Sequence, residues 1–292
     1  MSIFLILLAA GDSKRLKTRV PKPFLVVNNK TLLEHSLNAF KDFPEIKKKI
    51  IVYKKQHKKY IDNLYLKNIL KVYGGKNRQE STFKALKKIK KMRCTKVLIH
   101  DAARPNISKK LISKIIYKLK KKSIVIPIIK SNDAVKRTKN SIVFKNINRD
   151  GLSFAQTPQG FDFKKLYKKH YENIDKSFDD DSSLFTNHNE KIFTTYGSKE
   201  NLKITDKEDL NIFKSFKKTK IYTGIGFDVH RLERNRKLYL GGINIKSKLG
   251  TLGHSDGDPV LHAITDAILG ACKMGDIGEK FSNKDRIFKN IR

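Results

Sequence analysis

Short apolar runs alternate with amphipathic segments over the first two thirds of the chain. The apolar, β-rich runs predict strands at residues 3–9, 49–53, 69–73, 96–100 and 123–129. Between them, residues 31–42 and 108–121 place apolar side chains on one helical face, and Ser108 is a candidate N-cap. This alternation predicts an α/β fold whose mostly parallel sheet carries helices on both faces. Such sheets bind ligands beyond the carboxyl ends of their strands, so we expect chemistry in the loops that follow strands.

Two features interrupt this alternation. Residues 134–146 predict a hairpin with Lys139-Asn140 at its turn, and the hairpin could be an arm that reaches a second subunit. Residues 207–216 predict a helix, after which a new strand with its own glycine and histidine signals begins at Ile221. We therefore expect two domains, formed by residues 1–217 and 218–292.

The chain carries 64 lysine and arginine residues against 28 aspartate and glutamate residues, which gives a formal net charge of +36. A charge of this size first suggests a nucleic-acid partner. However, 12 of the cations are arginine and 64 − 12 = 52 are lysine, and the lysines recur in nearly every segment. Nucleic-acid readers favour arginine, whose planar fork pairs with phosphate and guanine edges. We expect solvated lysine faces and no specific nucleic acid, while a basic RNA- or DNA-binding protein remains an alternative.

Cysteine usage and the apolar runs indicate the compartment. The two cysteines, Cys94 and Cys272, exclude a disulfide framework and fit a reducing environment. No apolar run approaches the roughly 20 residues that a membrane helix needs. The run at residues 3–10 precedes the first charges, whereas a secretory signal carries its positive charge before the apolar stretch. We expect a cytoplasmic protein without a membrane partner.

Two glycine turns follow predicted strands. At the first, Ala9-Ala10-Gly11 lets backbone N–H groups approach an anion closely, and Arg15 and Pro21-Lys22-Pro23 come shortly afterwards. At the second, Gly74-Gly75 precedes Arg78 and Ser81, which could contact a nucleotide base or ribose. Either turn could also be an ordinary connection between a strand and a helix.

A carboxylate stands at the end of another predicted strand. In His100-Asp101-Ala102-Ala103-Arg104-Pro105, the alanines leave room beside Asp101, and such a carboxylate suits Mg²⁺ held against triphosphate oxygens. The alternative is an aspartate that caps a helix. Residues 201–206 place Lys203 in what we predict to be a compact polar strand.

Taken together in their order, these motifs with Thr157-Pro158-Gln159 and residues 201–205 resemble the 2-C-methyl-D-erythritol 4-phosphate cytidylyltransferase family over roughly residues 1–215. The resemblance implies a Rossmann-like nucleotidyltransferase fold, a homodimer, and transfer of a cytidylyl group from CTP to methylerythritol phosphate with release of pyrophosphate. It also implies that no general base is needed, because a phosphate nucleophile is already ionised. A related alternative is a sugar-1-phosphate nucleotidyltransferase, which shares the opening glycine turn.

The resemblance assigns roles by matching position. Three cations would stabilise charge on the reacting phosphates: Arg15, Lys22 and Lys203. Asp101 would hold Mg²⁺. The residues that would bind CTP or methylerythritol phosphate are Ala9, Ala10, Gly11, Gly75, Arg78, Ser81, Asp101, Arg104, Arg149 and Asp179. Arg149 matches a residue that acts across the family's dimer, whereas Asp179 replaces a threonine and would repel a phosphate.

The second segment carries a pattern typical of metal ligands. Asp228 and His230 lie two residues apart on a predicted strand and so project from one face, and His262 follows in a helical pattern. Two histidines and one carboxylate form a zinc set that leaves a fourth position for substrate. The alternative is that these are unrelated surface residues.

This segment resembles the amino-terminal part of the 2-C-methyl-D-erythritol 2,4-cyclodiphosphate synthase family, a phosphorus–oxygen lyase that releases CMP. The resemblance implies a partial α+β domain in which Asp228, His230 and His262 bind Zn²⁺ or a similar divalent metal. His254 would help to stabilise the transition state, and the other substrate contacts would be Ser255, Asp276 and Gly278. The family's domain is longer than this segment. We therefore expect the 292-residue polypeptide to lack synthase activity, and we do not expect the second domain to form the family's trimer.

Overall fold

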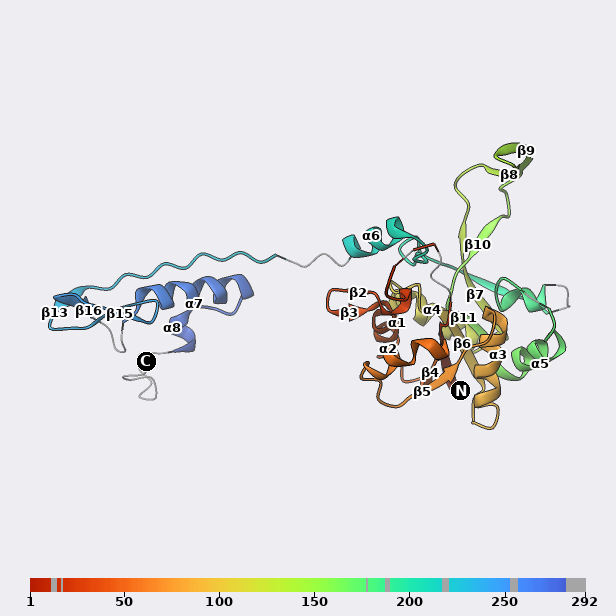
Figure 1. Cartoon of the computed structure of the whole chain (residues 1–292), viewed down its shortest axis with the longest axis horizontal. Coiled ribbons are helices and arrows are strands. Elements are labelled where there is room, and N and C mark those ends of the chain that lie inside the picture. Colours follow the sequence, from red (N-terminus) through yellow and green to blue (C-terminus); the bar gives the residue numbers. More distant parts are fainter. Residues whose placement is uncertain are drawn as a thin grey trace. The chain divides into compact units, whose positions relative to one another are not determined.

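The computed structural model describes residues 1–11, 15–16, 18–176, 178–186, 190–216, 221–252 and 257–281. The chain divides into two compact units, residues 1–218 and 219–292 (Figure 1). Within the described residues, no helix is long and apolar enough to cross a membrane. Both Cys94 and Cys272 are free.

The first unit is built on an eight-stranded sheet in the order β10-β7-β11-β6-β1-β4-β5, with β12 paired to β7. Its strands are β1 (Ile3–Ala9), β4 (Ile46–Tyr53), β5 (Ile69–Tyr73), β6 (Lys96–Asp101), β7 (Ile124–Lys130), β10 (Ser153–Ala155), β11 (Gln159–Asp162) and β12 (Phe193–Tyr196). The neighbours β5, β4, β1 and β6 run parallel to one another, and β12 runs parallel to β7. In contrast, β10 is antiparallel to β7, and β11 is antiparallel to both β6 and β7. This sheet confirms the predicted α/β class and the predicted strands.

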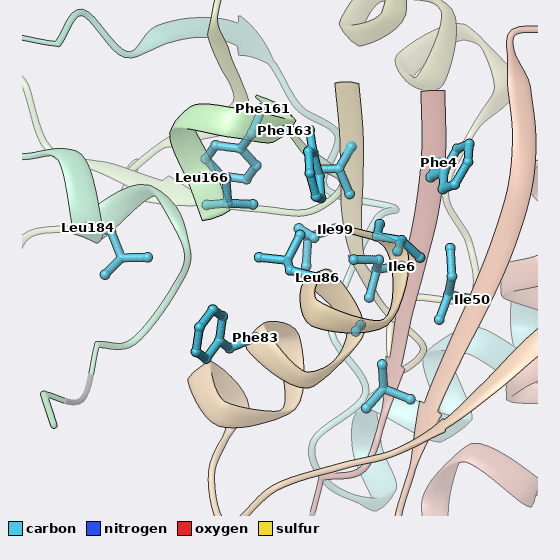
Figure 2. Packing of buried hydrophobic residues seen from close by; sticks show 14 of the residues in the cluster. Phe4, Ile6, Ile50, Phe83, Leu86, Ile99, Phe161, Phe163, Leu166 and Leu184 are labelled. Carbon is cyan, nitrogen blue, oxygen red and sulfur yellow. The ribbon is translucent and has the colours of Figure 1, made fainter. Parts of the chain in front are cut away.

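Helices cover both faces of the sheet. The helices of this unit are α1 (Leu32–Ala39), α2 (Lys58–Asp62), α3 (Arg78–Ile89), α4 (Lys109–Leu119), α5 (Phe163–Glu172) and α6 (Lys207–Phe216), with 3-10 turns at Lys22–Phe24, Lys55–His57 and Ser182–Phe185. Successive side chains of a strand point to opposite faces. Phe4 and Ile6 therefore pack in one cluster with α3 and α5, which contribute Phe83 and Leu166 (Figure 2). Ile3 and its neighbours on the other face pack against α4.

Side-chain caps explain where three of these helices begin. Thr31 and Glu34 form a capping box at α1, and the predicted Ser108 cap of α4 is confirmed because its hydroxyl accepts from the N–H of Leu111. Asn77 caps α3 by accepting from the N–H of Glu80. The α3 cap matters for the site because it fixes the first turn of that helix directly after the second glycine turn.

A hairpin of β8 (Val135–Lys139) and β9 (Ile142–Ile147) projects from the sheet beyond β7 and β10 (Figure 1). Its turn is centred on Asn140 and Ser141, one residue later than predicted, because these two residues adopt the positive φ angles, 50° and 65°. A second small ribbon joins β2 (Val26–Val27) to β3 (Lys30–Thr31).

In its described residues, the second unit contains two antiparallel strand pairs and two helices. Its elements are β13 (Leu232–Arg234), β14 (Leu238–Leu240), β15 (Ile243–Ile245), β16 (Leu249–Thr251), α7 (Pro259–Cys272) and α8 (Ile277–Lys280). The strand predicted from Ile221 is wrong, because residues 221–231 pair with no strand in the described chain. This segment instead approaches α7 through glycines: a Cβ on Gly226 would lie 1.7 Å from the Ala263 carbonyl oxygen.

Candidate functional site

A cavity of about 310 Å³ lies at the carboxyl ends of the parallel strands in the first unit. The segment Leu8–Gly11 leaves β1, Asp101 ends β6, and Gly75 follows β5. The described residues that line it are Leu8, Ala9, Ala10, Gly11, Arg15, Lys22, Pro23, Lys54, Gly75, Lys76, Asn77, Arg78, Ser81, Asp101, Ala103 and Lys203. The fold thus brings together the two glycine turns, the strand-end aspartate and the three predicted catalytic cations.

Asp101 is the acidic member of this lining. Lys203 Nζ lies 2.8 Å from its Oδ2 atom, and Arg78 Nε lies 3.5 Å from its Oδ1 atom. Burial alone would raise the pKa of Asp101, but Arg78 and Lys203 lower this pKa well below the usual range. The Asp101 carboxylate is therefore ionised at the edge of the cavity. It does not cap α4, which Ser108 caps.

The backbone beside Asp101 is fixed by a buried hydroxyl. Thr157 Oγ1 accepts from the Asp101 N–H at 3.1 Å and lies 3.0 Å from His100 Nδ1. His100 Nε2 lies 3.1 Å from the carbonyl oxygen of Arg104. Burial lowers the pKa of His100 to about 4, so the imidazole is neutral at pH 7. His100 and Thr157 therefore support Asp101 from behind and do not line the cavity.

Residues 201–206 do not form the predicted strand. They form no regular secondary structure, and long-range bonds hold them: Ile204 N donates to Ala103 O at 2.8 Å, and the Asn201 side-chain amide donates to Thr157 O at 2.9 Å. These bonds hold Lys203 against the end of β6. Lys22 Nζ donates to the Ile204 carbonyl oxygen at 2.9 Å, so this segment positions both lysines.

Cations dominate the cavity. Its described lining contains six lysine or arginine side chains and a single carboxylate. Burial, followed by the charges of Lys203 and Arg15, lowers the pKa of Lys22 from its ordinary value of 10.5. Like charges held this close repel one another, and a polyanionic ligand would relieve that repulsion. The electrostatics favour a triphosphate or several phosphates as the ligand.

The second glycine turn packs against the first. A Cβ on Gly74 would lie 2.6 Å from Ala10 Cβ, so only glycine permits the two turns to approach this closely. Ser81 Oγ accepts from Gly75 N at 2.9 Å and donates to Asn77 O at 2.8 Å. The Ser81 side chain therefore shapes the turn, and its hydroxyl already has protein partners at the cavity wall.

Three predicted substrate-binding residues do not line this cavity. Arg104 donates from Nη1 to the Asn201 carbonyl oxygen at 2.8 Å, behind the segment that carries Lys203. Arg149 is exposed at the base of the hairpin and donates to Asn132 O, and Asp179 is exposed.

A buried pair that the sequence does not predict lies behind Arg78. Asp181 Oδ2 lies 2.6 Å from Arg78 Nη1, and Asp181 Oδ1 lies 3.0 Å from His170 Nε2. The run Asp179–Asp181 is visible in the sequence, but the family resemblance points to Asp179 and not to Asp181. The spacing of apolar residues in α5 predicts that His170 is buried, but it does not predict which residue His170 contacts.

The second unit brings Asp228, His230 and His262 together as predicted, with one ligand atom of each within 4.8 Å of the others. Asp228 Oδ2 lies 2.8 Å from both His230 Nε2 and His262 Nδ1. Asp228 and His230 follow Gly224 and Gly226, the glycines that approach α7, and α7 carries His262.

This donor set fits a divalent metal. Two imidazole nitrogens and one carboxylate oxygen suit zinc or a similar ion with an open position. His230 Nδ1 lies 3.1 Å from the Leu252 carbonyl oxygen, and this contact orients the ring with Nε2 toward the other two ligands. Asp276 caps α8, which contains Gly278. His254 and Ser255 lie outside the described residues.

Two family models match the chain. The model described as 2-C-methyl-D-erythritol 4-phosphate cytidylyltransferase (IspD) matches residues 3–217, and the YgbB family model matches residues 221–292. The first match favours the cytidylyltransferase reading over the sugar-1-phosphate alternative.

Relatives and solved structures agree with both matches. A "Bifunctional enzyme IspD/IspF" of Pelagibacter ubique is 49% identical over 292 residues, which are 100% of this chain and 77% of that protein. The bifunctional IspDF structure from Campylobacter jejuni has a TM-score of 0.64 at 34% identity, covering 100% of this chain and 76% of its own. A Francisella tularensis 2-C-methyl-D-erythritol 4-phosphate cytidylyltransferase structure has a TM-score of 0.65 at 27% identity, covering 75% of this chain and 100% of its own.

Proposed function

The chain belongs to the bifunctional IspD/IspF family, and on this premise we propose that its first unit transfers a cytidylyl group from CTP to 2-C-methyl-D-erythritol 4-phosphate. Pyrophosphate is the second product. The reaction is a step of non-mevalonate isoprenoid precursor biosynthesis. The second unit adds a partial IspF-like region to the same polypeptide.

One observation carries the proposal. The cavity at the ends of β1, β5 and β6 combines two glycine turns, a cluster of cations and the ionised carboxylate of Asp101. Backbone N–H groups in small-residue turns and lysine or arginine side chains are the usual partners of nucleotide phosphates. Within the described lining, the excess of cations over carboxylates matches a ligand with several negative charges.

The chemistry requires positioning and charge stabilisation. A phosphate oxygen of the methylerythritol phosphate attacks the α-phosphorus of CTP, and the bond from that phosphorus to the β-phosphate oxygen breaks. The nucleophile is ionised at neutral pH, so no residue has to remove a proton. Arg15, Lys22 and Lys203 are proposed to stabilise negative charge on the α-phosphate and the leaving pyrophosphate.

Asp101 is proposed to hold Mg²⁺. The fit rests on its donor chemistry, because an ionised carboxylate at a cavity edge leaves the other positions of the ion for phosphate oxygens and water. When bound, Mg²⁺ neutralises charge on the triphosphate. Lys203 contacts the same carboxylate, so its ammonium group is close to where the phosphates would bind.

The methylerythritol phosphate is proposed to bind beside CTP with help from Arg149 of a second subunit. Arg149 lies at the base of the exposed hairpin, and the hairpin carries the exposed apolar side chains Ile142, Val143 and Phe144. Such a surface suits contact between two copies of the chain. We therefore propose a homodimer through the first unit.

In the second unit, Asp228, His230 and His262 are proposed to bind Zn²⁺ or a similar divalent ion, as their converging ligand atoms suggest. The expectation that the 292-residue polypeptide forms no cyclic diphosphate stays a prediction. It is tested by incubating the purified chain with the cytidylylated substrate and divalent metal, and detection of cyclic product would contradict it.

Pyrophosphate release tests the proposed function. The native chain, Lys22→Ala and Asp101→Ala are each supplied with CTP, Mg²⁺ and methylerythritol phosphate. We expect both substitutions to lower the rate about a hundredfold or more, which is the scale of removing one transition-state charge contact. Glu190→Gln is a matched control, because Glu190 pairs only with surface Lys165 among the described residues. Unchanged rates in both variants would show that the site is assigned wrongly.

A further inference from the structure

Arg78 stands between two carboxylates. Its Nε lies 3.5 Å from Asp101, whereas its Nη1 lies 2.6 Å from Asp181. Its buried Nη2 atom has no hydrogen-bond partner in the part of the chain that the structure describes. The Asp181 contact is therefore the one short bond that fixes the guanidinium plane, and short charge-assisted bonds of this kind are the strong ones.

Asp181 is held in turn by α5. Its side chain is 1% exposed, and that of His170 is 0% exposed. A carboxylate oxygen accepts, so His170 donates from Nε2 to Asp181 Oδ1 at 3.0 Å. The His170 ring stacks on Phe83 with 5.8 Å between centroids and 7° between planes. The two oxygens of Asp181 thus connect a packed imidazole on one side to Arg78 on the other.

We propose that Asp181 and His170 are positioning residues that hold the Arg78 guanidinium against the wall of the nucleotide cavity. The proposal rests on the proposed function, in which Arg78 contacts CTP. Arg78 lines the cavity, but Asp181 and His170 are absent from its described lining, so they act through Arg78 and do not touch the substrate.

Charge explains why this position needs holding. Arg78 also faces Asp101 at the longer distance, and the charge of Asp180 acts on it less than either of these two. Without the charge of Asp181, the guanidinium would move toward Asp101, and a carboxylate bound to arginine is less available to a metal and its nucleotide. Asp181 therefore holds the Arg78 guanidinium at the cavity wall, where CTP is proposed to bind. It also keeps this guanidinium from binding Asp101 more closely.

Kinetics with Asp181→Asn separate positioning from folding. The amide keeps the size of the side chain but removes its charge, so we expect KM for CTP to rise about tenfold while kcat stays within about twofold. His170→Phe keeps the aromatic stack on Phe83 and removes the bond to Asp181, and it should raise KM by about threefold. A purely structural role would instead lower the folded fraction and the apparent kcat, with KM unchanged.

A double-mutant cycle tests the route through Arg78. In an Arg78→Gln background, adding Asp181→Asn should change the CTP dissociation constant by less than about twofold, measured by calorimetry. A tenfold effect that persists without Arg78 would overturn the proposal, as would an unchanged KM in both Asp181→Asn and His170→Phe.

The adjacent carboxylate provides a control for damage to the local turn. Asp180 accepts from Gln159, Ser182 and Ser183, and among the described residues it forms no hydrogen bond or ion pair with Arg78, on which its charge acts less than that of Asp181. Asp180→Asn should lower the melting temperature and change KM for CTP much less than Asp181→Asn does. A native chain that neither binds nor turns over CTP would contradict the proposed function itself, whereas normal turnover without coupling contradicts only the positioning role.

Discussion

Replacing Asp101 by asparagine should lower the free energy of unfolding of the first unit. This is the opposite of the usual trade-off, in which replacing an active-site residue raises stability at the expense of function. The substitution preserves the shape of the side chain and removes the one carboxylate in the described lining of the cavity. Arg78 and Lys203 together lower its pKa despite its burial. The carboxylate is therefore stabilised by folding, and removing its charge leaves neighbouring cations without that partner.

The magnitude follows from these contacts. The Lys203 side chain is 42% exposed, so solvent screens part of its 2.8 Å ion pair, and the Arg78 contact is long. We expect a loss of about 1–3 kcal/mol in the free energy of unfolding at pH 7. Because the folded pKa lies below the ordinary value of 3.8, this contribution is present above that pH and is lost as pH falls through the folded pKa. The difference between the two proteins should shrink by about 1 kcal/mol at about pH 3.

Urea unfolding followed by far-ultraviolet circular dichroism measures this difference at both pH values. Asp62→Asn provides the control, because Asp62 is an exposed partner of Lys71 and its loss should cost less than about 0.5 kcal/mol. An Asp101→Asn variant as stable as the native chain at pH 7 would refute the electrostatic reasoning. A difference that grows as the pH falls would refute it equally.

Three further predictions concern single residues. CTP affinity should fall as pH rises toward 10.5, because burial and Lys203 lower the pKa of Lys22 and the neutral amine attracts phosphate less. Calorimetric titrations of CTP measure this fall, and Lys22→Arg should move it to higher pH. An affinity for CTP that does not change with pH would contradict this prediction. His262→Ala should weaken Zn²⁺ binding about a hundredfold or more in competition with a chromophoric chelator, and unchanged affinity would show that the cluster is not a metal site. Gly226→Ala should also weaken Zn²⁺ binding, because its methyl group would lie 1.7 Å from a carbonyl oxygen of α7, whereas Gly270→Ala has open space and should bind normally.

Long, strongly apolar elements were predictable from the sequence, and short paired ones were not. The prediction for β1 agrees with the structure because Ile3–Ala9 is apolar throughout and buried on both faces. β10, β11 and β12 have three or four residues each, too few for a periodic pattern. Residues 201–206 read as a strand, but the Ile204 N–H donates to Ala103 O and the Thr205 N–H donates to the Asp209 side chain, which no local pattern reports.

In the candidate site, too, the features that a local pattern marks were predictable, and those set by long-range contacts were not. Asp101, Gly75 and Gly11 end or follow strands, where chemistry was expected because such sheets bind ligands beyond the carboxyl ends of their strands. Asp181 was missed because its partner Arg78 lies 103 residues earlier in the chain. Arg149 was selected by resemblance alone, and the structure of one chain leaves it outside the cavity.

Phosphorus-31 nuclear magnetic resonance of the native chain with CTP, Mg²⁺ and methylerythritol phosphate tests the central claim most directly. We expect one pyrophosphate for each new cytidine diphosphate ester, formed only when both substrates are present. The ester should not form when a sugar 1-phosphate replaces methylerythritol phosphate. No ester from methylerythritol phosphate, or faster transfer to the sugar phosphate, would contradict the account.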